Sequence, residues 1–481
     1  MKKIFYSFSA LLSIGTNPVN AAPSNEPSER PNIIIIVADD LGWGDLGYNG
    51  STIKTPNLDR LSEEGIRLSR FYVAPISSPT RAGLMTGMYP NRFGIRESVI
   101  PPWRDFGLEP ENLIIPEFLG KHGYNNRAII GKWHLGHSKP KYYPLNNGFT
   151  HFYGHLNGAI DYFTHERDGE LDWHNDYASS FDKGYSTNLV AEESVKCIRN
   201  YSNEGPFFLY VAFNAPHTPL EAEKEDLKLY GYDESKPDFS KKASKQNPGQ
   251  GNTRKQTYSA MVTCMDRGIG RILETLRELK IEENTLVIFL SDNGADEGSG
   301  GGSSGPLKGN KFLEYEGGVH APAILRWPSR LSGGKTVDQL TGFVDVFPTI
   351  CDIVAPGNSN PAPFDGISIL KVLEGKEKTK ERTFYLGCGA LIENEWKIIR
   401  AGQNPQMKLG KDVLYNIVTD PYEQNDLSDK YPEIREKLMK KVMMYDTIKP
   451  EKEVLPFNVG KEGFVPPKEW NIFLKKDTSE K

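Results

Sequence analysis

Three runs of consecutive apolar residues constrain the fold of this chain more than any other feature of its sequence. They span residues 32–38, 207–213 and 286–290 and are rich in Ile, Val, Leu and Phe. Unbroken runs of this kind are typical of strands buried on both faces, as in a parallel sheet covered by helices. Residues 57–65 and 258–279 carry apolar residues at three- and four-residue spacing, which predicts helices between the strands. We therefore expect an α/β fold.

The pattern changes from about residue 376. Short strand patterns follow at residues 396–399 and 413–415, and a charged helical pattern follows near residues 431–444. We therefore predict a large domain over residues 23–375 and a smaller C-terminal subdomain with its tail over residues 376–481.

The N-terminal 22 residues have the pattern of a secretory signal peptide. Lys2 and Lys3 precede an apolar stretch, and small residues stand at the cleavage spacing before residue 22. No segment reaches the roughly 20 apolar residues of a membrane-spanning helix, so we expect no membrane contact and a periplasmic or secreted protein. The formal net charge of −5 gives no sign of a nucleic-acid-binding surface, and an anionic substrate would need local cations to hold it.

Polar side chains with oxygen donors follow two of the apolar runs. Asp39 and Asp40 come directly after the first run, and Asp292 and Asn293 follow the third. Ligands of open α/β sheets bind beyond the carboxyl ends of the strands, so these four side chains are expected near one another. Hard oxygen ligands favour Ca²⁺, with Mg²⁺ as the alternative, over zinc. Either pair taken alone is also compatible with an ordinary strand-end turn.

Residues 77–81, with the sequence Ser-Ser-Pro-Thr-Arg, are expected to open a helix. Pro79 suits the first helical position, and Ser77 or Ser78 suits the cap. The N-terminus of a helix binds anions through its free N–H groups and its dipole, and Arg81 adds a guanidinium. An ordinary Ser-capped helix is the alternative interpretation of the same pattern.

This segment, with Thr-Gly at residues 86–87, resembles the signature of the formylglycine-dependent sulfatases, the type I enzymes of the alkaline phosphatase superfamily. Most members of that family have Cys where this chain has Ser77, and some bacteria oxidise Ser by a separate, oxygen-independent maturing enzyme. Further stretches match the family in its own order: Asp39-Asp40, residues 131–136, 215–219 and 291–294, Lys311 with residues 316–318, and residues 414–423. The resemblance covers about residues 31–440.

The resemblance implies a large mixed, mostly parallel sheet flanked by helices, with a smaller C-terminal α+β domain that contains a short antiparallel sheet. It also implies that residue 77 is oxidised to formylglycine, which attacks sulfur. The metal ligands that it implies are Asp39, Asp40, Ser77, Asp292 and Asn293. The residues to which it gives other catalytic roles are Arg81, Lys132 and Lys311 for charge stabilisation, His217 as acid and His134 as base. The acid and the base are interchangeable at this level, because sequence gives no distances.

The implied activity is hydrolysis of sulfate monoesters, on a sulfated carbohydrate or polysaccharide such as carrageenan. Residues 153–173, with His155 and His165, could line a sugar subsite or form a surface loop. A maturing enzyme is the expected partner during biogenesis. Two alternatives stay open: a phosphatase or phosphodiesterase of the same superfamily, and a non-catalytic binder of sulfated glycans if Ser77 is unmodified.

Overall fold

A ten-stranded sheet forms the centre of the protein, seen in a computed structural model that describes residues 1, 30–239, 250–357, 361–450 and 454–474. The predicted signal peptide, apart from Met1, lies outside the described residues. Among the helices of the described ranges, none has the length and apolar character needed to cross a membrane. The strands of the large sheet, in spatial order, are β13 (Lys335–Val337), β2 (Ile66–Leu68), β12 (Ala323–Arg326), β11 (Thr285–Ser291), β1 (Asn32–Ala38), β10 (Phe207–Ala212), β4 (Asn126–Lys132), β5 (His151–His155), β8 (His174–Asn175) and β9 (Ala178–Ser179).

The sheet is mixed and mostly parallel, as predicted. The central strands β11, β1, β10, β4 and β5 pair in parallel, whereas β12 and β8 run antiparallel to their neighbours. β1 is buried on both faces, because Ile33, Ile35 and Val37 pack into one hydrophobic core and the alternate residues pack into the other. The unbroken apolar runs in the sequence reflect this two-sided burial.

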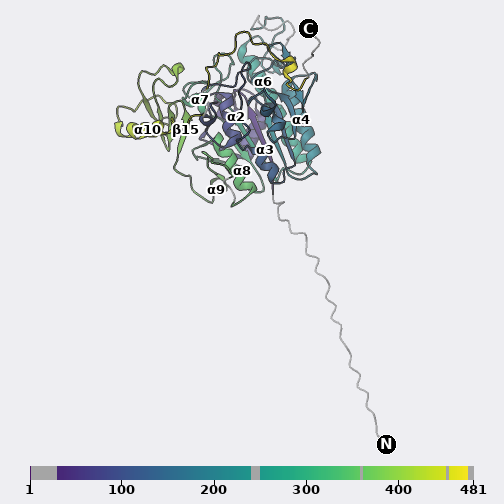
Figure 1. Ribbon diagram of the computed structural model, residues 1–481, viewed down its shortest axis with the longest axis horizontal. Helices are drawn as coiled ribbons and strands as arrows, with labels where there is room; N and C mark the ends of the chain where they lie inside the picture. The colour runs from purple at the N-terminus through teal and green to yellow at the C-terminus, as the bar shows by residue number, and fades with distance from the viewer. Residues whose placement is uncertain (2–29, 240–249, 358–360, 451–453, 475–481) are drawn as a thin grey trace.

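Helices cover both faces of the large sheet (Figure 1). One core includes α2 (Ser77–Thr86), α3 (Ile115–Lys121), α8 (Val346–Val354) and α9 (Leu370–Leu373). The other includes α1 (Pro56–Glu64), α4 (Ser186–Tyr201), α5 (Lys224–Lys228) and α6 (Arg254–Glu278). A short helix, α7 (Glu316–Val319), precedes β12.

A separate four-stranded antiparallel sheet lies beside the main body, at the left of Figure 1, as predicted for the C-terminal part of the chain. It consists of β15 (Thr383–Gly387), β16 (Ala390–Glu393), β17 (Trp396–Ile399) and β18 (Val413–Asn416), with α10 (Pro432–Tyr445) packed on it. Two further sheets have two strands each: β3 (Phe71–Tyr72) with β14 (Thr341–Gly342), and β6 (Glu166–Arg167) with β7 (Glu170–Leu171). The domain boundary at residue 376 stays a prediction.

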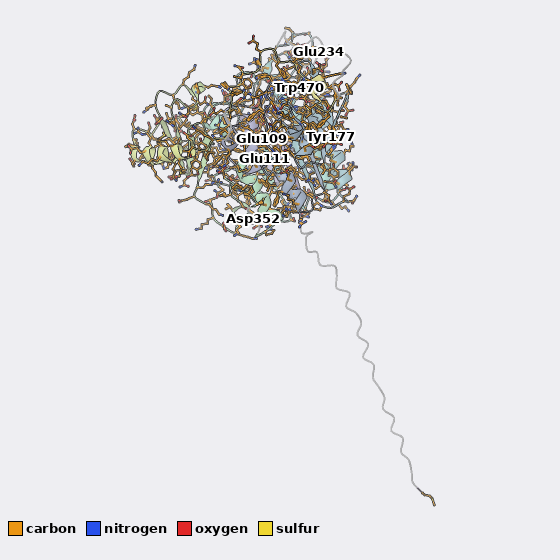
Figure 2. The ribbon with its side chains drawn as sticks, in the orientation of Figure 1. Glu109, Glu111, Tyr177, Glu234, Asp352 and Trp470 are labelled. Carbon is orange, nitrogen blue, oxygen red and sulfur yellow. The ribbon has the colours of Figure 1, made fainter. Side chains whose placement is uncertain are left out.

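After α10 the chain returns to the main body. The short 3₁₀ helix η8 (Lys468–Trp470) contacts β7, and the buried Trp470 indole donates to the carbonyl oxygen of Arg167 (2.8 Å). Figure 2 labels Trp470 at the upper end of the main body, well away from α10. The C-terminal part of the chain therefore packs on the four-stranded sheet through α10 and on the β6–β7 sheet through η8.

Candidate active site

The carboxyl ends of β1, β11 and β4 bring together side chains that the sequence singled out. Asp39 follows β1 directly, Asp292 follows β11 directly, and Lys132 is the last residue of β4. Parallel neighbours start their loops at the same edge of a sheet, so residues far apart in sequence meet there. The ten predicted site residues lie around this edge: Asp39, Asp40, Ser77, Arg81, Lys132, His134, His217, Asp292, Asn293 and Lys311.

Ser77 lies at the first position of α2 and points at a carboxylate. Its Oγ donates a hydrogen bond to Oδ2 of Asp292 across 2.6 Å, and Nε of Arg81 donates to the same Oγ across 2.9 Å. Arg81 also donates to Oδ2 of Asp292 from Nε (3.0 Å) and Nη2 (2.8 Å). All three side chains are buried, so each polar group depends on the others for its partners.

The predicted cap of this helix is wrong in detail. Helix α2 begins at Ser77, with Ile76 at the N-cap and no capping hydrogen bond from a side chain, so Pro79 is the third helical residue. The hydroxyl of Ser78 donates instead to the carbonyl oxygen of His134 (3.1 Å). Both serine hydroxyls are therefore used by partners across the site, and neither is left to cap the helix.

Two buried lysines contact the two aspartates that follow β1. Lys132 hydrogen-bonds Oδ2 of Asp39, and Nη2 of Arg81 lies 3.7 Å from the same oxygen. Lys311 reaches both carboxylate oxygens of Asp40, at 2.7 and 2.8 Å. A buried lysine is rare unless it is paired. Burial lowers the pKa of Lys132 in spite of Asp39, whereas Asp40 outweighs burial and raises the pKa of Lys311.

The two aspartates differ in their electrostatics. Burial and the charge of Asp292 raise the pKa of Asp39 to about 7, although Lys132 counteracts them. Burial also raises the pKa of Asp40, but Lys311 and the other groups around it outweigh burial and hold that pKa below its ordinary value. Negative charge at Asp39 is thus incompletely compensated by the side chains alone.

The donor atoms fit a divalent cation. Oδ1 of Asp39 and Oδ1 of Asn293 are buried and have no hydrogen-bond partner within the described part of the chain. Nδ2 of Asn293 donates to Oδ1 of Asp40 (2.7 Å), which fixes the orientation of the amide. Asp39, Asp40 and His217 each bring a ligand atom within 4.8 Å of the others. An oxygen-rich set with unpaired buried acceptors suits Ca²⁺ or Mg²⁺.

His134 is buried close to the cations. Its Nδ1 has no partner among the described residues, and its backbone takes the left-handed conformation (φ 57°) that is uncommon for a residue with a side chain. Burial, Lys132 and Arg81 hold its pKa well below the ordinary value, so the imidazole is neutral near neutral pH. A neutral ring with a free nitrogen can accept a proton.

His217 is half-buried on the side of Asp40. Its Nδ1 lies 2.5 Å from the carbonyl oxygen of Thr218, and its Nε2 lies 3.7 Å from Oδ2 of Asp40. Burial lowers its pKa to about 4, with Lys311 and Lys132 contributing, against the opposing effect of Asp40. Nδ1–H donates to this carbonyl oxygen, which leaves Nε2 as the nitrogen that can exchange a proton.

The sequence analysis did not single out Asn214, which follows β10 at the same edge. Both atoms of its side-chain amide are buried and lack a hydrogen-bond partner in the described structure. Asp39, His134 and Asn293 also have buried atoms without a partner in the described ranges, and these residues come after β1, β4 and β11, respectively. Asn214 thus joins these three residues, which have unpaired buried atoms at the same edge of the sheet. The available signal was its place directly after a buried apolar run, as for Asp39.

The segment 153–173 is largely part of the core. His155 and His165 are buried and stack on the ring of Trp173, at centroid distances of 6.2 and 4.6 Å. Trp173 is itself fully buried. Since these rings pack on one another, neither histidine is available to line a sugar subsite.

Comparisons with known proteins agree with one another. The family model described as Sulfatase matches residues 31–355. Arylsulfatase J of Mus musculus is 30% identical over 474 residues, covering 87% of this chain and 76% of that protein. N-acetylgalactosamine-6-sulfatase of Homo sapiens is 32% identical over 384 residues, covering 75% and 69%. The crystal structure of Ps i-CgsB in complex with k-i-k-neocarrahexaose is similar, with a TM-score of 0.76 and 30% identity over 87% of this chain and 93% of that one.

Proposed function

Because the chain belongs to the sulfatase family, whose type I members are part of the alkaline phosphatase superfamily, it is a sulfuric ester hydrolase. We propose that it acts on a sulfated carbohydrate. We further propose that the reaction uses formylglycine derived from Ser77 and a bound divalent cation. The observation that carries the proposal is the position of Ser77, whose Oγ lies between Asp292 and Arg81 at the start of α2. A reactive oxygen there faces a helix N-terminus and a buried guanidinium, both of which favour negative charge.

Oxidation of Ser77 removes one hydrogen from Oγ and one from Cβ. A separate, oxygen-independent maturing enzyme accepts the two electrons and two protons. The hydrate of the resulting aldehyde supplies a nucleophilic hydroxyl, and its second hydroxyl provides the route for releasing sulfate. Arg81 holds the oxygen at position 77 through Nε and holds Asp292 through Nη2, so it orients the nucleophile and its neighbouring carboxylate together.

We propose that the cation is Ca²⁺, with Mg²⁺ as the alternative, held by Asp39, Asp40, residue 77, Asp292 and Asn293. When bound, it supplies Lewis-acid polarisation of the sulfate group. The unpaired acceptors of Asp39 and Asn293 support this ligand set.

Lys132, Lys311 and Arg81 are proposed to neutralise charge on the sulfate oxygens as the ester bond breaks. Lys132 is fully buried and Lys311 nearly so, and positive charge in a site without water stabilises a developing anion far more than it would in solvent. These groups are already oriented by Asp39 and Asp40, so little reorganisation is needed during the reaction.

His217 is proposed to protonate the leaving alcohol, with Lys311 assisting, and His134 to accept a proton when sulfate is released. The lowered pKa values leave both rings neutral near neutral pH and so do not distinguish the acid from the base; leaving-group dependence does. Loss of the true acid slows esters with poor leaving groups by about 10²–10⁴-fold but affects 4-nitrophenyl sulfate much less. Kinetics of His217→Ala and His134→Ala on both ester types test the assignment; equal losses on both esters for His217→Ala would contradict it.

Two similar proteins support a carbohydrate substrate. One is described as N-acetylgalactosamine-6-sulfatase, and the structure of Ps i-CgsB contains a neocarrahexaose. We propose a sulfated polysaccharide such as carrageenan as the substrate, and a periplasmic or secreted location, where such a large substrate is accessible. Sulfate release from defined sulfated oligosaccharides, with the maturing enzyme co-expressed, tests the substrate class.

Mass spectrometry tests the nucleophile directly. The tryptic peptide that ends at Arg81 should be about 2 Da lighter than the Ser77 form when the residue is an aldehyde. If the peptide of an active preparation has the unmodified mass, the formylglycine proposal is wrong. If the peptide of an inactive preparation has the unmodified mass, this result supports the alternative of a sulfated-glycan binder. Faster hydrolysis of an aryl phosphate than of the matching aryl sulfate would favour the phosphatase alternative.

A further inference from the structure

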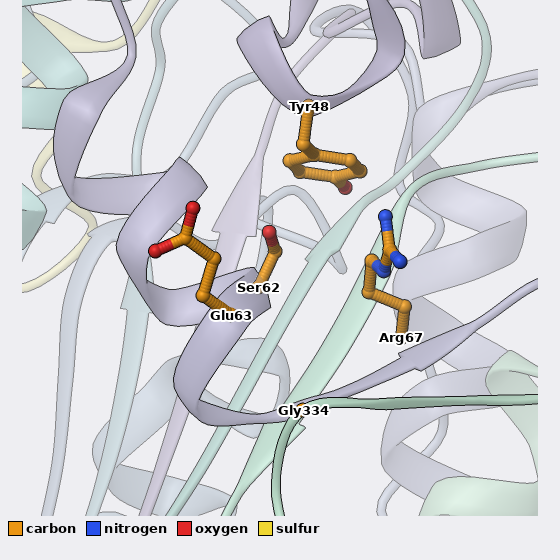
Figure 3. Close-up of a pocket in the computed structure, with 5 residues that line it drawn as sticks. All are labelled: Tyr48, Ser62, Glu63, Arg67 and Gly334. Carbon is orange, nitrogen blue, oxygen red and sulfur yellow. The ribbon is translucent and has the colours of Figure 1, made fainter.

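A groove beside the large sheet contains polar groups that the active site does not use. Its first hollow, of about 390 Å³, is lined by Tyr48, Ser62, Glu63, Arg67 and Gly334, and Figure 3 shows these residues around one space. An adjoining hollow of about 200 Å³ shares Tyr48 and Arg67. We call the two together the Tyr48–Arg67 groove. The volume of the first hollow lies in the range of roughly 300–1,000 Å³ that is typical of small-molecule sites.

Three of the charged and polar groups that line this groove have no side-chain partner in the described structure. Within the described ranges, the Arg67 guanidinium, the Glu63 carboxylate and the Tyr48 hydroxyl have neither an ion pair nor a hydrogen bond with another side chain. The guanidinium lies 6.0 Å from the centroid of the Tyr48 ring, close enough for a cation–π contact that orients it. By contrast, the neighbouring Glu64 is paired with Arg60, Arg277 and Arg326.

These groups come from three elements with fixed positions. Tyr48 lies in the 3₁₀ helix η2 (Gly47–Asn49), Glu63 lies near the end of α1, and Arg67 is the middle residue of β2. The backbone N–H of Tyr48 donates to Asp59 of α1 (2.9 Å), which ties η2 to the helix. Because the elements are packed together, the groove is preformed and binding requires little ordering.

The groove leads toward the active-site edge of the sheet. The second hollow is lined in part by Trp43 and His320. Trp43 stands three residues after Asp40, and His320 follows α7 and lies 3.2 Å from Glu316. The backbone N–H of Ser291, the residue before Asp292, donates to the carbonyl oxygen of Pro322 (3.3 Å), which also lines the second hollow, so this hollow lies beside the strand end that carries Asp292.

We propose that the Tyr48–Arg67 groove binds a second anionic sugar residue of the substrate, which rests on the proposed function of the active site. The guanidinium of Arg67 donates to a sulfate group, for which its planar fork is suited. The Tyr48 ring packs against the sugar ring, and Glu63 accepts from sugar hydroxyls. The substrate class is thus an oligosaccharide or polysaccharide with sulfate groups on more than one residue.

The test is equilibrium binding by the full chain expressed without a maturing enzyme, so that Ser77 is unmodified and turnover does not interfere. The probes are a sulfated carrageenan hexasaccharide, its desulfated form and a sulfated disaccharide. Arg67→Ala should weaken hexasaccharide binding about five- to tenfold, and Arg67→Lys less, because a lysine keeps the charge without the fork. The matched control Arg60→Ala removes an exposed guanidinium of α1 and should leave the affinity unchanged.

Equal hexasaccharide affinities for Arg67→Ala and the wild-type chain overturn the groove proposal. The groove proposal is also overturned if the wild-type chain binds the hexasaccharide no more tightly than the disaccharide. Sulfate release from sulfated oligosaccharides by the matured wild-type chain separates this result from a failure of the proposed function. Sulfate release without a gain in hexasaccharide affinity over the disaccharide refutes the groove alone, whereas absence of sulfate release from all of the oligosaccharides refutes the catalytic proposal.

Discussion

Lys397 of β17 donates a hydrogen bond to Oε1 of Glu316, the first residue of α7, across 2.8 Å, and both side chains are buried. Oε1 of Glu423 lies 3.0 Å from the same ammonium, and Oε2 of Glu423 accepts the backbone N–H of Glu316 (2.7 Å). The small sheet thus holds α7 by a buried group of three charges. Since α7 follows Lys311 by only a few residues, this contact also restrains the loop that carries Lys311.

Replacing Lys397 with Met should destabilise the protein strongly. The substitution keeps most of the side-chain volume but leaves two buried carboxylates without their cation, which costs about 3–5 kcal/mol of unfolding free energy. The matched control is Lys437→Met, which removes an exposed lysine from Glu393 while Lys441 still pairs with that carboxylate, and it should cost at most about 1 kcal/mol. Urea unfolding measures both. Similar losses for the two variants would show that the buried contact has no special role.

Stability should fall at alkaline pH because of His151. Burial lowers the pKa of this ring, but hydrogen bonds involving Cys197 and Glu193 and the charge of Asp176 raise it to about 10. A folded-state pKa above the unfolded value of about 6.5 stabilises the protein fully below that pH, and this contribution is lost as the pH rises through about 10. The wild-type chain should therefore lose at least about 1 kcal/mol more between about pH 7 and about pH 9.5 than His151→Asn does.

Thermal unfolding of both chains across that range checks this expectation. The variant starts from a lower stability, because Asp176 and Glu193 lose their contact with the imidazolium, although Lys196 still pairs with Glu193. The informative quantity is the slope of stability with pH, and not the stability itself. Parallel slopes for the two chains would mean that His151 is not protonated in the folded state.

Calcium should stabilise the folded chain whether or not residue 77 is modified. Binding to the native state alone adds about 2.7 kcal/mol at a concentration one hundred times the dissociation constant. The response should disappear in Asp39→Asn, which removes a carboxylate whose Oδ1 is unpaired. The exposed Asp429→Asn should respond as the wild-type chain does. Differential scanning calorimetry with chelator, Ca²⁺ or Mg²⁺ provides the comparison; an undiminished response in Asp39→Asn would exclude this ligand set.

The strands and the acidic residues at their ends could be predicted because a strand buried on both faces is an unbroken run of apolar residues in the sequence. The run before Asp39 is apolar at every position, and the polar pair after it marks the end of the strand. The helix at Ser77 was also predictable, but its cap was not. Its two serine hydroxyls bond to Asp292 and His134, which are 215 and 56 residues away, and no local pattern reports such partners.

Contacts between distant parts of the chain were beyond local reasoning for the same reason. Lys397 and Glu316 are 81 residues apart, and each looks like an ordinary surface charge in sequence. For His155 and His165 the sequence suggested a sugar subsite, but the structure shows both rings packed on the buried Trp173. The sequence pattern does not distinguish these two roles. Burial and pairing, which decide between such roles, are properties of the folded chain.

Asn214 provides a test in which activity and stability should separate. Its amide is buried with both polar atoms unpaired among the described residues, an arrangement that costs stability unless a ligand completes it. Asn214→Ala removes those unpaired atoms, so the unfolding free energy should change by less than about 1 kcal/mol, because the gain from removing them offsets the small cavity. If the amide donates to the bound ester, kcat/KM should fall by about tenfold or more, which corresponds to about 1.4 kcal/mol of lost transition-state stabilisation. Urea unfolding and steady-state kinetics on one preparation give both numbers. A large loss of stability with unchanged kcat/KM would instead assign Asn214 to packing, with partners supplied by water.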